Sequence, residues 1–491
     1  MEFPFLRSML SLWLVISSIT LTAQGESRAR PNVLFIAVDD MRPEMASYGG
    51  RALTPHMDRL AASGLQFDRA YCNQSVCGAS RVSLMTGLYP EYTQERTYHV
   101  TDWRKRWHDV TTLNQHFKNN GYTTVGVGKI YHGSRGRGVD PENWTQWIIP
   151  DAGTEYANPD NTKLKLENQK KTDGKRRGPS TEAYVTSDET HFDGQRAAIG
   201  AEQIRTLSQK DEPFFVAVGF TKPHLPFVAP QKYWDLYSEQ TCTLPLNTGK
   251  PPGYPDYASN KNAGELRSYS DIPQGVPPQD FPETLNQRLI HGYLACVSYT
   301  DRNIGVLLDA LETAGVVDNT IVVLWADHGW KLGDHTSWCK HTNFECDNRV
   351  PLMIRYPKMS KTRGRTQSLT ELIDLFPTLC DLCDLDKPSH LQGKSLLPVL
   401  KNPKLTHRAF AYSSYPHGRG QGLQGVTGHS IRTRQYRYTE WWEKGSDSVV
   451  ESILTDIESD PGELTRVTDQ QQLEQMLSAL VKERVLDVRK P

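Results

Sequence analysis

Short runs of apolar residues, rich in β-branched side chains, mark the strongest strand signals in this chain. They cover residues 32–38, 213–220 and 320–325, and each is continuously apolar rather than alternating. Continuous runs of this length are typical of strands that are buried on both faces of a largely parallel sheet. We therefore predict that these three segments lie in the interior of such a sheet.

Helical patterns separate the predicted strands. Residues 57–62 and 111–118 are short candidates, and residues 288–314 form a long one that Gly315 is expected to end. The long segment places six apolar residues close to one helical face: Leu289, Tyr293, Val297, Ile304, Leu308 and Leu311. Strands that alternate with helices predict an α/β fold, with a large mixed, mostly parallel central sheet sandwiched by helices.

Three other segments have a different character. Residues 151–184 are polar and rich in Lys and Arg, which indicates either a solvated surface insertion or a loop that contacts a polyanion. Residues 244–282 are rich in Pro and Gly and predict an ordered loop over the rim of the sheet. Residues 430–438 alternate like a strand and precede a helical segment at 470–485. We predict a main domain at 24–415 and a smaller α+β subdomain at 416–491, with a small antiparallel sheet and a helix.

The first 23 residues have the layout of a secretory signal peptide. Arg7 precedes an apolar stretch at 9–21, and the small residues Thr22 and Ala23 follow it. The stretch is short for a membrane span, although an uncleaved N-terminal anchor is the alternative. We expect export to the periplasm or the medium, or to the lysosome in an animal, without stable membrane insertion.

Charge and cysteine content narrow the classes of partner. The chain has 56 Lys and Arg against 57 Asp and Glu, so no global field favours nucleic acid, and an anionic substrate would need a local cluster of cations. Export permits disulfides among the eight cysteines, but their spacing does not reveal the pairing. Cys380 and Cys383 lie in an apolar run at 372–385 that looks helical, so they belong to the core or form a local disulfide.

Charged residues follow all three predicted strands. Asp39 and Asp40 end the first, Lys222 and His224 follow the second, and Asp327-His328-Gly329 follows the third. In open α/β sheets, ligands bind outside the carboxyl ends of the strands. Carboxylates that meet there repel one another unless a divalent cation joins them, and oxygen ligands favour calcium or magnesium. Helix capping by Asp39 or Asp40 is the simpler alternative for either residue alone.

The most specific string is Cys77-Gly78-Ala79-Ser80-Arg81, which Leu84-Met85-Thr86-Gly87 continues. The apolar residues after it predict a helix with Cys77 at its N-terminus, where the helix dipole favours an anion. A lone cysteine in this setting is more often structural, so its meaning depends on the residues around it.

This string resembles the signature of type I sulfatases, a branch of the alkaline phosphatase superfamily, although the usual form has Pro where this chain has Ala79. The resemblance is closest to the iduronate-2-sulfatase branch and extends over nearly the whole chain after the leader. Further strings in register are Val38-Asp39-Asp40, Thr54-Pro55-His56-Met57-Asp58, Gly128-Lys129-Ile130-Tyr131-His132, Lys222-Pro223-His224-Leu225-Pro226-Phe227, Asp327-His328-Gly329-Trp330, Trp338-Cys339-Lys340 and Asn343-Phe344-Glu345.

The resemblance implies a sulfuric ester hydrolase that acts on a sulfated saccharide. It implies that a formylglycine-generating or sulfatase-maturing enzyme oxidises Cys77 to formylglycine. The roles that it implies are as follows: Asp39, Asp40, Asp327, His328 and the modified Cys77 surround one calcium ion, Arg81 holds the formylglycine hydrate, Lys129 and Lys340 bind sulfate, and His132 and His224 transfer protons.

Two other functions remain open at this point. One is a phosphomonoesterase or phosphonate hydrolase of the same superfamily, and a phosphatase usually has ligands for a second metal ion. The other is an inactive protein that binds sulfated glycans with Cys77 unmodified.

Trp330, Trp338 and His335 either shape a sugar pocket or pack in the core.

Overall fold

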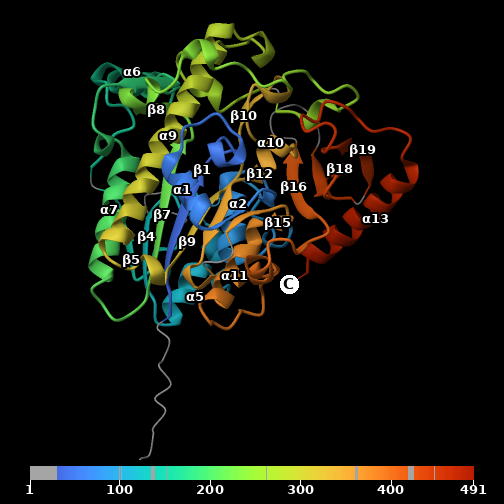
Figure 1. The fold of residues 1–491 in the computed structure, drawn as a ribbon. Helices are drawn as coiled ribbons and strands as arrows, with labels where there is room; N and C mark the ends of the chain where they lie inside the picture. Colours follow the sequence, from blue (N-terminus) through green and yellow to red (C-terminus); the bar gives the residue numbers. More distant parts are fainter. Residues whose placement is uncertain are drawn as a thin grey trace, which may run out of the picture.

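An eight-stranded sheet forms the centre of the computed structural model, which describes residues 30–98, 100, 102–133, 139–150, 152–260, 262–359, 363–417, 425–446 and 448–490 (Figure 1). In spatial order its strands are β14 Gly364–Thr366, β2 Leu65–Phe67, β13 Leu352–Arg355, β9 Thr320–Ala326, β1 Asn32–Asp39, β7 Phe214–Pro223, β4 Thr123–Gly128 and β5 Gln146–Ile148. The predicted signal peptide, residues 1–23, lies outside the described residues.

The three apolar runs of the sequence form three adjacent strands in the middle of this sheet. β1 pairs in parallel with β9 on one side and with β7 on the other, and every residue of β1 and β9 is buried. β4 and β5 continue the parallel arrangement, whereas β13 runs antiparallel to both β9 and β2. The prediction of a mixed, mostly parallel sheet is therefore confirmed.

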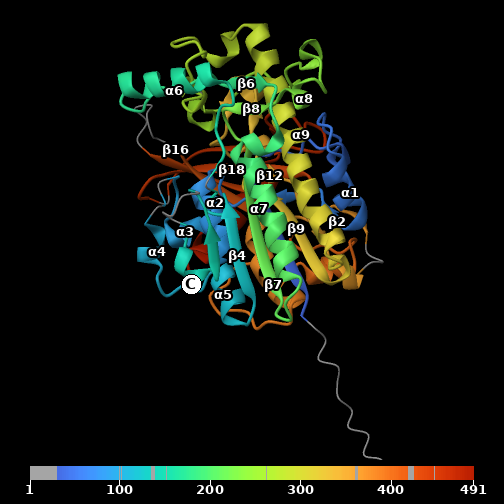
Figure 2. The same ribbon diagram turned by 90° about the vertical axis from the view of Figure 1, so that its left-hand side faces the viewer.

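The α-helices are α1 Pro55–Ser63, α2 Cys77–Thr86, α3 Pro90–Thr93, α4 Trp103–Arg106, α5 Leu113–Asn119, α6 Pro159–Lys171, α7 Phe192–Leu207, α8 Gln231–Trp234, α9 Glu283–Thr313, α10 Glu345–Asn348, α11 Leu375–Leu382, α12 Leu397–Lys401 and α13 Gln471–Val488. α1, α7 and α9 lie on one side of the sheet and α2 and α5 on the other, with α11 packed on α2 (Figure 2). The helices predicted at 57–62, 111–118 and 288–314 are α1, α5 and α9.

Small sheets surround the central one. One pairs β10 Lys331–Leu332 with β11 Trp338–Cys339, and another pairs β6 Thr181–Tyr184 with β8 Phe227–Pro230. In the third, β3 Ala70–Tyr71 lies between β12 Arg349–Val350 and β15 Thr370–Glu371. Among the described residues, no helix combines the length and apolar character needed to cross a bilayer.

The polar segment at 151–184 is more ordered than an insertion loop, because it contains α6 and β6. Asn158 caps α6 by accepting a hydrogen bond from the N–H of Asp160 at 2.9 Å, and Pro159 occupies the first turn. No residue of α6 is buried, so the helix has no apolar stripe that a search for periodicity can detect.

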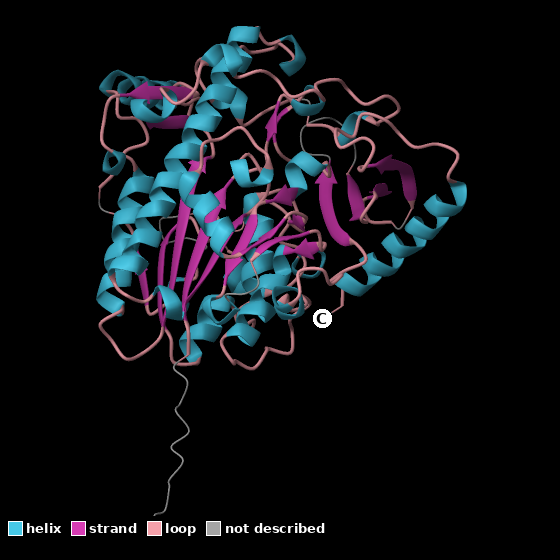
Figure 3. Cartoon of the chain, in the orientation of Figure 1, coloured by secondary structure: helices cyan, strands magenta, loops and turns pink. Residues whose placement is uncertain are grey.

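A four-stranded antiparallel sheet forms the C-terminal part, with strands β16 Ala411–His417, β17 Val426–Arg432, β18 Tyr436–Glu443 and β19 Val449–Asp456 (Figure 3). The prediction of one strand at 430–438 is wrong, because a turn at Thr433 separates β17 from β18 and the N–H of Thr433 donates to Tyr436 O at 2.8 Å. α13 packs on this sheet through Leu477, Val481 and Val485, and the boundary at 415/416 stays a prediction.

All eight cysteines lie among the described residues, and none of them forms a disulfide there. Cys380 belongs to α11 and Cys383 follows it, and both are fully buried. Of the two readings of this pair, the structure shows core packing.

Candidate active site

The candidate site lies at the carboxyl ends of the central strands. Asp39 is the last residue of β1, and Asp327 follows β9 directly. The N–H of Asp327 donates to Val38 O at 3.2 Å, and the N–H of Asp40 donates to the Asp327 carboxylate at 3.2 Å. Adjacent parallel strands thus bring Asp327 to the consecutive pair Asp39 and Asp40, which is far from it in the sequence.

Four side chains form a compact group of metal-ligand type at this point. Ligand atoms of Asp39, Asp40, Cys77 and His328 all lie within 4.8 Å of one another, and all four residues are buried. Nε2 of His328 is buried and lies 3.4 Å from Oδ1 of Asp40, so this nitrogen faces the carboxylates of the group. Two carboxylates fit a hard divalent cation, although a nitrogen ligand is unusual for calcium.

Asp327 borders this group and makes other contacts. Its Oδ2 accepts a hydrogen bond from Nε of Arg81 at 2.8 Å, and its Oδ1 accepts one from the N–H of His328 at 3.0 Å. Oδ2 also lies 3.6 Å from Nε2 of His328. The role of Asp327 as a direct metal ligand therefore stays a prediction.

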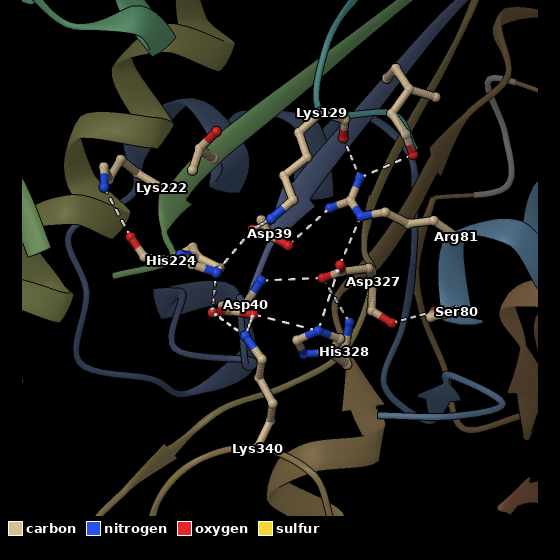
Figure 4. Close-up of polar contacts among 12 residues, drawn as sticks. Asp39, Asp40, Ser80, Arg81, Lys129, Lys222, His224, Asp327, His328 and Lys340 are labelled. Atoms are coloured by element: carbon tan, nitrogen blue, oxygen red, sulfur yellow. Dashed lines mark hydrogen bonds and ion pairs between the residues drawn. The ribbon is translucent and has the colours of Figure 1, made fainter. Parts of the chain in front are cut away.

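Arg81 lies at the centre of the buried charges (Figure 4). Besides Asp327, its guanidinium contacts Asp39 Oδ1 at 3.3 Å, donates to Ile130 O at 3.1 Å and hydrogen-bonds to Lys129 O. A fully buried guanidinium is tolerated only when its donors find partners, and here carboxylates and carbonyl oxygens supply them. Arg81 comes from α2, which begins at Cys77 as the sequence predicted.

Two lysines reach the carboxylates from different loops. Nζ of Lys129 contacts Asp39, and Nζ of Lys340 lies 2.8 Å from Oδ1 of Asp40. The N–H of Lys129 donates to Gly219 O at 2.9 Å, and a Cβ at Gly219 would come within 2.2 Å of the Lys129 backbone. Gly219 therefore allows β7 to approach the segment that carries Lys129.

Lys340 stands in an unusual stretch of backbone. Its neighbours Cys339 and His341 have φ angles of 72° and 88°, a region that non-glycine residues rarely adopt. The ammonium group lies 4.8 Å from the centre of the Trp330 ring, which favours a cation electrostatically. Strain of this kind persists where surrounding contacts determine the conformation, and it is common at functional sites.

The aromatic residues that were open to two interpretations are buried. Trp330 is fully buried beneath Lys340, and Trp338 is 1 % exposed. His335 stacks on Phe344 at 4.0 Å and its Nε2 hydrogen-bonds to Gly462 O at 2.8 Å. Of the two readings, packing describes all three residues.

The two histidines with expected proton-transfer roles lie beside the site, His132 near Cys77 and His224 near Asp40. Burial acts to raise the pKa of the Cys77 thiol, but Lys340, Lys129 and His132 hold it well below its usual value. Nδ1 of His224 lies 2.6 Å from Leu225 O, and its Nε2 lies 3.9 Å from Oδ2 of Asp40. Nζ of Lys222 donates to His224 O at 2.9 Å and holds this segment in place.

Burial and neighbouring charges shift the pKa values of the two adjacent aspartates in opposite directions. Burial raises the pKa of Asp40 to about 7, although Lys340 and His224 act against this rise. Burial also acts to raise the pKa of Asp39, but Lys129 and His224 hold it well below its usual value. The site thus lacks the positive charge that would fully ionise both carboxylates, and a divalent cation would supply it.

Glu265 is a site residue that the sequence did not reveal, because it is an isolated acid in the loop at 244–282. It forms a second acidic group with Asp40 and His224, again with ligand atoms within 4.8 Å. Nζ of Lys340 lies 2.8 Å from Asp40 and 3.0 Å from Glu265, so an ammonium group already joins the two carboxylates. We interpret this second group as an ion-pair network rather than as a second metal site.

A cavity of about 830 Å³ opens beside the site. It reaches Val76, which precedes Cys77, and His341, which follows Lys340. Its other described lining residues include the aromatic Tyr98, Tyr257 and Tyr415, the cationic Arg96, Lys444 and Arg489, and the acidic Glu443. This lining suits an anionic ligand with faces that stack on aromatic rings.

The fold and this site define a sulfatase, and the comparison with family models agrees. The model for the sulfatase family matches residues 31–385, and the model for the C-terminal part of N-sulphoglucosamine sulphohydrolase matches residues 333–490. The chain belongs to the sulfatase family and is an enzyme.

Named relatives lie in the branch that the sequence indicated. The chain is 30 % identical to the iduronate 2-sulfatase of Homo sapiens over 89 % of its own length and 90 % of the relative's. It is 32 % identical to the iduronate 2-sulfatase of Mus musculus, over 85 % and 86 %. It is also 30 % identical to a sulfatase of Formosa agariphila, over 88 % and 82 %.

Solved structures share the fold. BT4656, solved in complex with its substrate D-glucosamine-2-N,6-O-disulfate, superposes with a TM-score of 0.72 at 23 % identity, over 94 % of this chain and 98 % of that one. The phosphonate monoester hydrolase of Agrobacterium radiobacter superposes with a TM-score of 0.68 at 22 % identity, over 94 % and 95 %. The predicted α/β architecture is thus confirmed.

Proposed function

We propose that this enzyme removes sulfate from a sulfated carbohydrate, with formylglycine made from Cys77 and with one calcium ion. The observation that carries the proposal is the convergence of Asp39, Asp40, Cys77 and His328 within 4.8 Å. The cations Lys129 and Lys340, and the cavity of about 830 Å³ beside this group, suit an anionic substrate.

The residues present fit a divalent cation. Asp39, Asp40, His328 and the modified residue 77 would hold it, with Asp327 beside them. When bound, a calcium ion supplies Lewis acidity that lowers the pKa of a coordinated hydroxyl group.

The reacting group belongs to residue 77, where the Cys77 sulfur marks the position that the aldehyde and its hydrate would take. One hydroxyl of the hydrate gives up its proton to water and attacks the sulfur of the sulfate ester. The bond from that sulfur to the sugar oxygen breaks on the opposite side as the sugar oxygen takes a proton from His224. The second hydroxyl then loses its proton to His132, sulfate is expelled, and the aldehyde re-forms. Lys129 and Lys340 neutralise the sulfate oxygens, and donors of this kind contribute about 3–4 kcal/mol each.

Arg81 is the residue that holds this arrangement together. Its contacts with Asp39 and Asp327 fix the first turn of α2, and therefore residue 77, relative to the strand ends. Accurate placement of the nucleophile matters because a displacement of about 1 Å costs roughly 10²-fold in rate.

The names of the similar proteins indicate a class of substrate. Relatives named iduronate 2-sulfatase suggest a 2-sulfated uronic acid or a related sugar, in a glycosaminoglycan or an algal polysaccharide. Arg96, Lys444 and Arg489 in the cavity would suit a further anionic group of such a saccharide. We also propose that the chain is exported, since residues 1–23 have the pattern of a signal peptide.

The test is a co-expression with a sulfatase-maturing enzyme. Mass spectrometry of the peptide that contains Cys77 should show the loss of sulfur and two hydrogens and the gain of oxygen. The matured protein should then release sulfate from one member of a panel of defined sulfated oligosaccharides. Conversion without release from any member would contradict the proposal, and an unconverted Cys77 would favour a binding protein without turnover.

A phosphonate hydrolase is the second candidate, because a phosphonate monoester hydrolase has the same fold. Sulfate and phosphonate groups are both tetrahedral anions. Rates on para-nitrophenyl sulfate and on phenyl phosphonate esters separate the two, together with the number of metal ions per chain. We expect one ion and a preference for sulfate.

A further inference from the structure

The loop at 244–282 delivers one carboxylate into the active site. Oε1 of Glu265 lies 2.8 Å from Nε2 of His224, and Oε2 lies 3.0 Å from Nζ of Lys340. Each carboxylate oxygen therefore contacts a different member of the expected machinery. Glu265 is 20 % exposed in its side chain, so the contacts are only partly shared with solvent.

These contacts complete the restraint of the His224 ring. Nδ1 already lies 2.6 Å from Leu225 O, and Glu265 contacts the nitrogen on the other side of the ring. A ring held at both nitrogens keeps one orientation, with Nε2 3.9 Å from Asp40. The Nε2 proton that passes to the leaving oxygen is therefore first shared with Glu265, and it leaves that contact as the oxygen takes it. A group that hands a proton to a leaving oxygen has to be placed in this way, since general acid catalysis depends first on geometry.

The same carboxylate restrains Lys340. The ammonium group lies between Asp40 at 2.8 Å and Glu265 at 3.0 Å, above the Trp330 ring. The amide of Asn260, from the same loop, donates to Lys340 O at 2.9 Å. One loop therefore fixes both the backbone and the side chain of this lysine.

The loop itself is anchored, so the position of Glu265 is defined. The N–H of Arg177 donates to Ser268 O at 2.8 Å. The N–H of Ser180 donates to Oδ1 of Asp271 at 2.7 Å, and Arg288 donates to its Oδ2 at 2.9 Å. These contacts come from the segment before β6 and from α9, and they do not involve His224 or Lys340.

A carboxylate beside an anion-binding lysine weakens the binding of an anionic substrate. It repels an approaching sulfate group and takes up part of the positive charge that would bind it. Such a residue weakens substrate binding, so its presence indicates a benefit in a later step.

We infer that Glu265 is a positioning residue, which aims His224 at the leaving oxygen and fixes the spacing between His224 and Lys340. This inference rests on the proposed function. It distinguishes Glu265 from a residue that only holds the loop, because a positioning residue acts on the step in which the alcohol leaves.

The test uses the matured, calcium-loaded enzyme and two substrates that differ in leaving group. Para-nitrophenyl sulfate releases a stable anion and needs little help from an acid, whereas phenyl sulfate releases a more basic oxygen. Glu265→Gln should lower kcat on phenyl sulfate by roughly 10–100-fold, part of the effect of a general acid, and by less than about 3-fold on para-nitrophenyl sulfate. KM should stay the same or fall, because a repulsive charge is removed.

A double-mutant cycle supplies the second measurement, on the oligosaccharide that the panel selects. In the His224→Ala background, Glu265→Gln should have little further effect on kcat, because the residue that it positions is absent. Asp256→Asn is the matched control, since it removes an exposed carboxylate of the same loop that contacts Lys250 and is not one of the anchoring contacts. This control should leave the ratio of kcat on phenyl sulfate to kcat on para-nitrophenyl sulfate unchanged.

The outcomes are separable. If Glu265→Gln slows both aryl sulfates equally, raises KM, or adds its full effect to that of His224→Ala, the inference is wrong while the sulfatase function stands. If the wild-type enzyme releases sulfate from no substrate, the proposed function itself fails.

Discussion

Nε of Arg81 donates to Oδ2 of Asp327 at 2.8 Å, and both side chains are fully buried. This pair joins α2, which begins at Cys77, to the end of β9. The signature string and the third strand end are therefore parts of one charged network, in which the arginine compensates buried carboxylates as well as positioning residue 77.

Replacing Arg81 should lower the free energy of unfolding of the protein. Arg81→Ala leaves two buried carboxylates without their shared partner, and breaking a buried ion pair in this way costs about 3–5 kcal/mol. Arg81→Lys keeps the charge but not the fork of donors, so it should cost less. Denaturant unfolding measures both, and equal stability of all three proteins would contradict this account.

Cys77→Ala should abolish turnover while leaving the fold intact. The residue is 3 % exposed at the start of α2, and alanine fits there without strain. Sulfate release should fall to background, and circular dichroism and the unfolding midpoint should match the wild type. Clear activity of Cys77→Ala would exclude the aldehyde mechanism, because alanine has no group that can be oxidised to an aldehyde.

Calcium should stabilise the protein as well as activate it. Chelation should stop sulfate release, and addition of calcium should restore it. A ligand at 100 times its Kd raises the unfolding free energy by about 2.7 kcal/mol, so the unfolding midpoint should rise with calcium. Asp39→Asn is the control, because it removes one expected ligand. A calcium-dependent midpoint that survives in this variant would place the ion elsewhere.

The contact between α10 and the C-terminal sheet should weaken in acid. Burial acts to raise the pKa of Glu345, but Arg432 and Arg437 lower it to about 2. The unfolded carboxyl titrates near 4.5, so the unfolded chain binds more protons between these values. The stability that this carboxylate contributes is therefore present above about pH 4.5 and is lost as the pH falls towards 2.

Urea unfolding at several pH values checks this. Glu345→Gln should be less stable than the wild type at pH 6, and the difference should shrink as the pH approaches 2. A difference that does not depend on pH would show that charge at Glu345 contributes nothing.

The cations that line the cavity, Arg96, Lys444 and Arg489, should affect KM rather than kcat. Arg96 lines the cavity, and its Nε is buried without a hydrogen-bond partner. Arg96→Ala should raise KM on the anionic oligosaccharide about tenfold, the equivalent of roughly 1.4 kcal/mol, with kcat little changed. On para-nitrophenyl sulfate, which lacks a second anionic group, KM should stay the same. A loss of kcat on both substrates would contradict a binding role.

Local sequence patterns were sufficient to predict the central strands of the sheet and the helix α2. The apolar runs that became β1, β7 and β9 owe their conformation to burial on both faces, which composition records directly. α6 escaped detection because it buries nothing, and the turn at Thr433 escaped because no Gly or Pro marks it.

The sequence by itself determined the family, the place of Cys77 at the start of a helix and the acids at the strand ends, since each depends on a short string next to a predictable strand or helix. Only the tertiary structure decided that Glu265 reaches His224 and Lys340, and that Asp327 meets Arg81. Those relationships depend on how an anchored loop and a helix cross the sheet. No local pattern carries that information, because contacts between distant segments are selected by the packing of the whole fold.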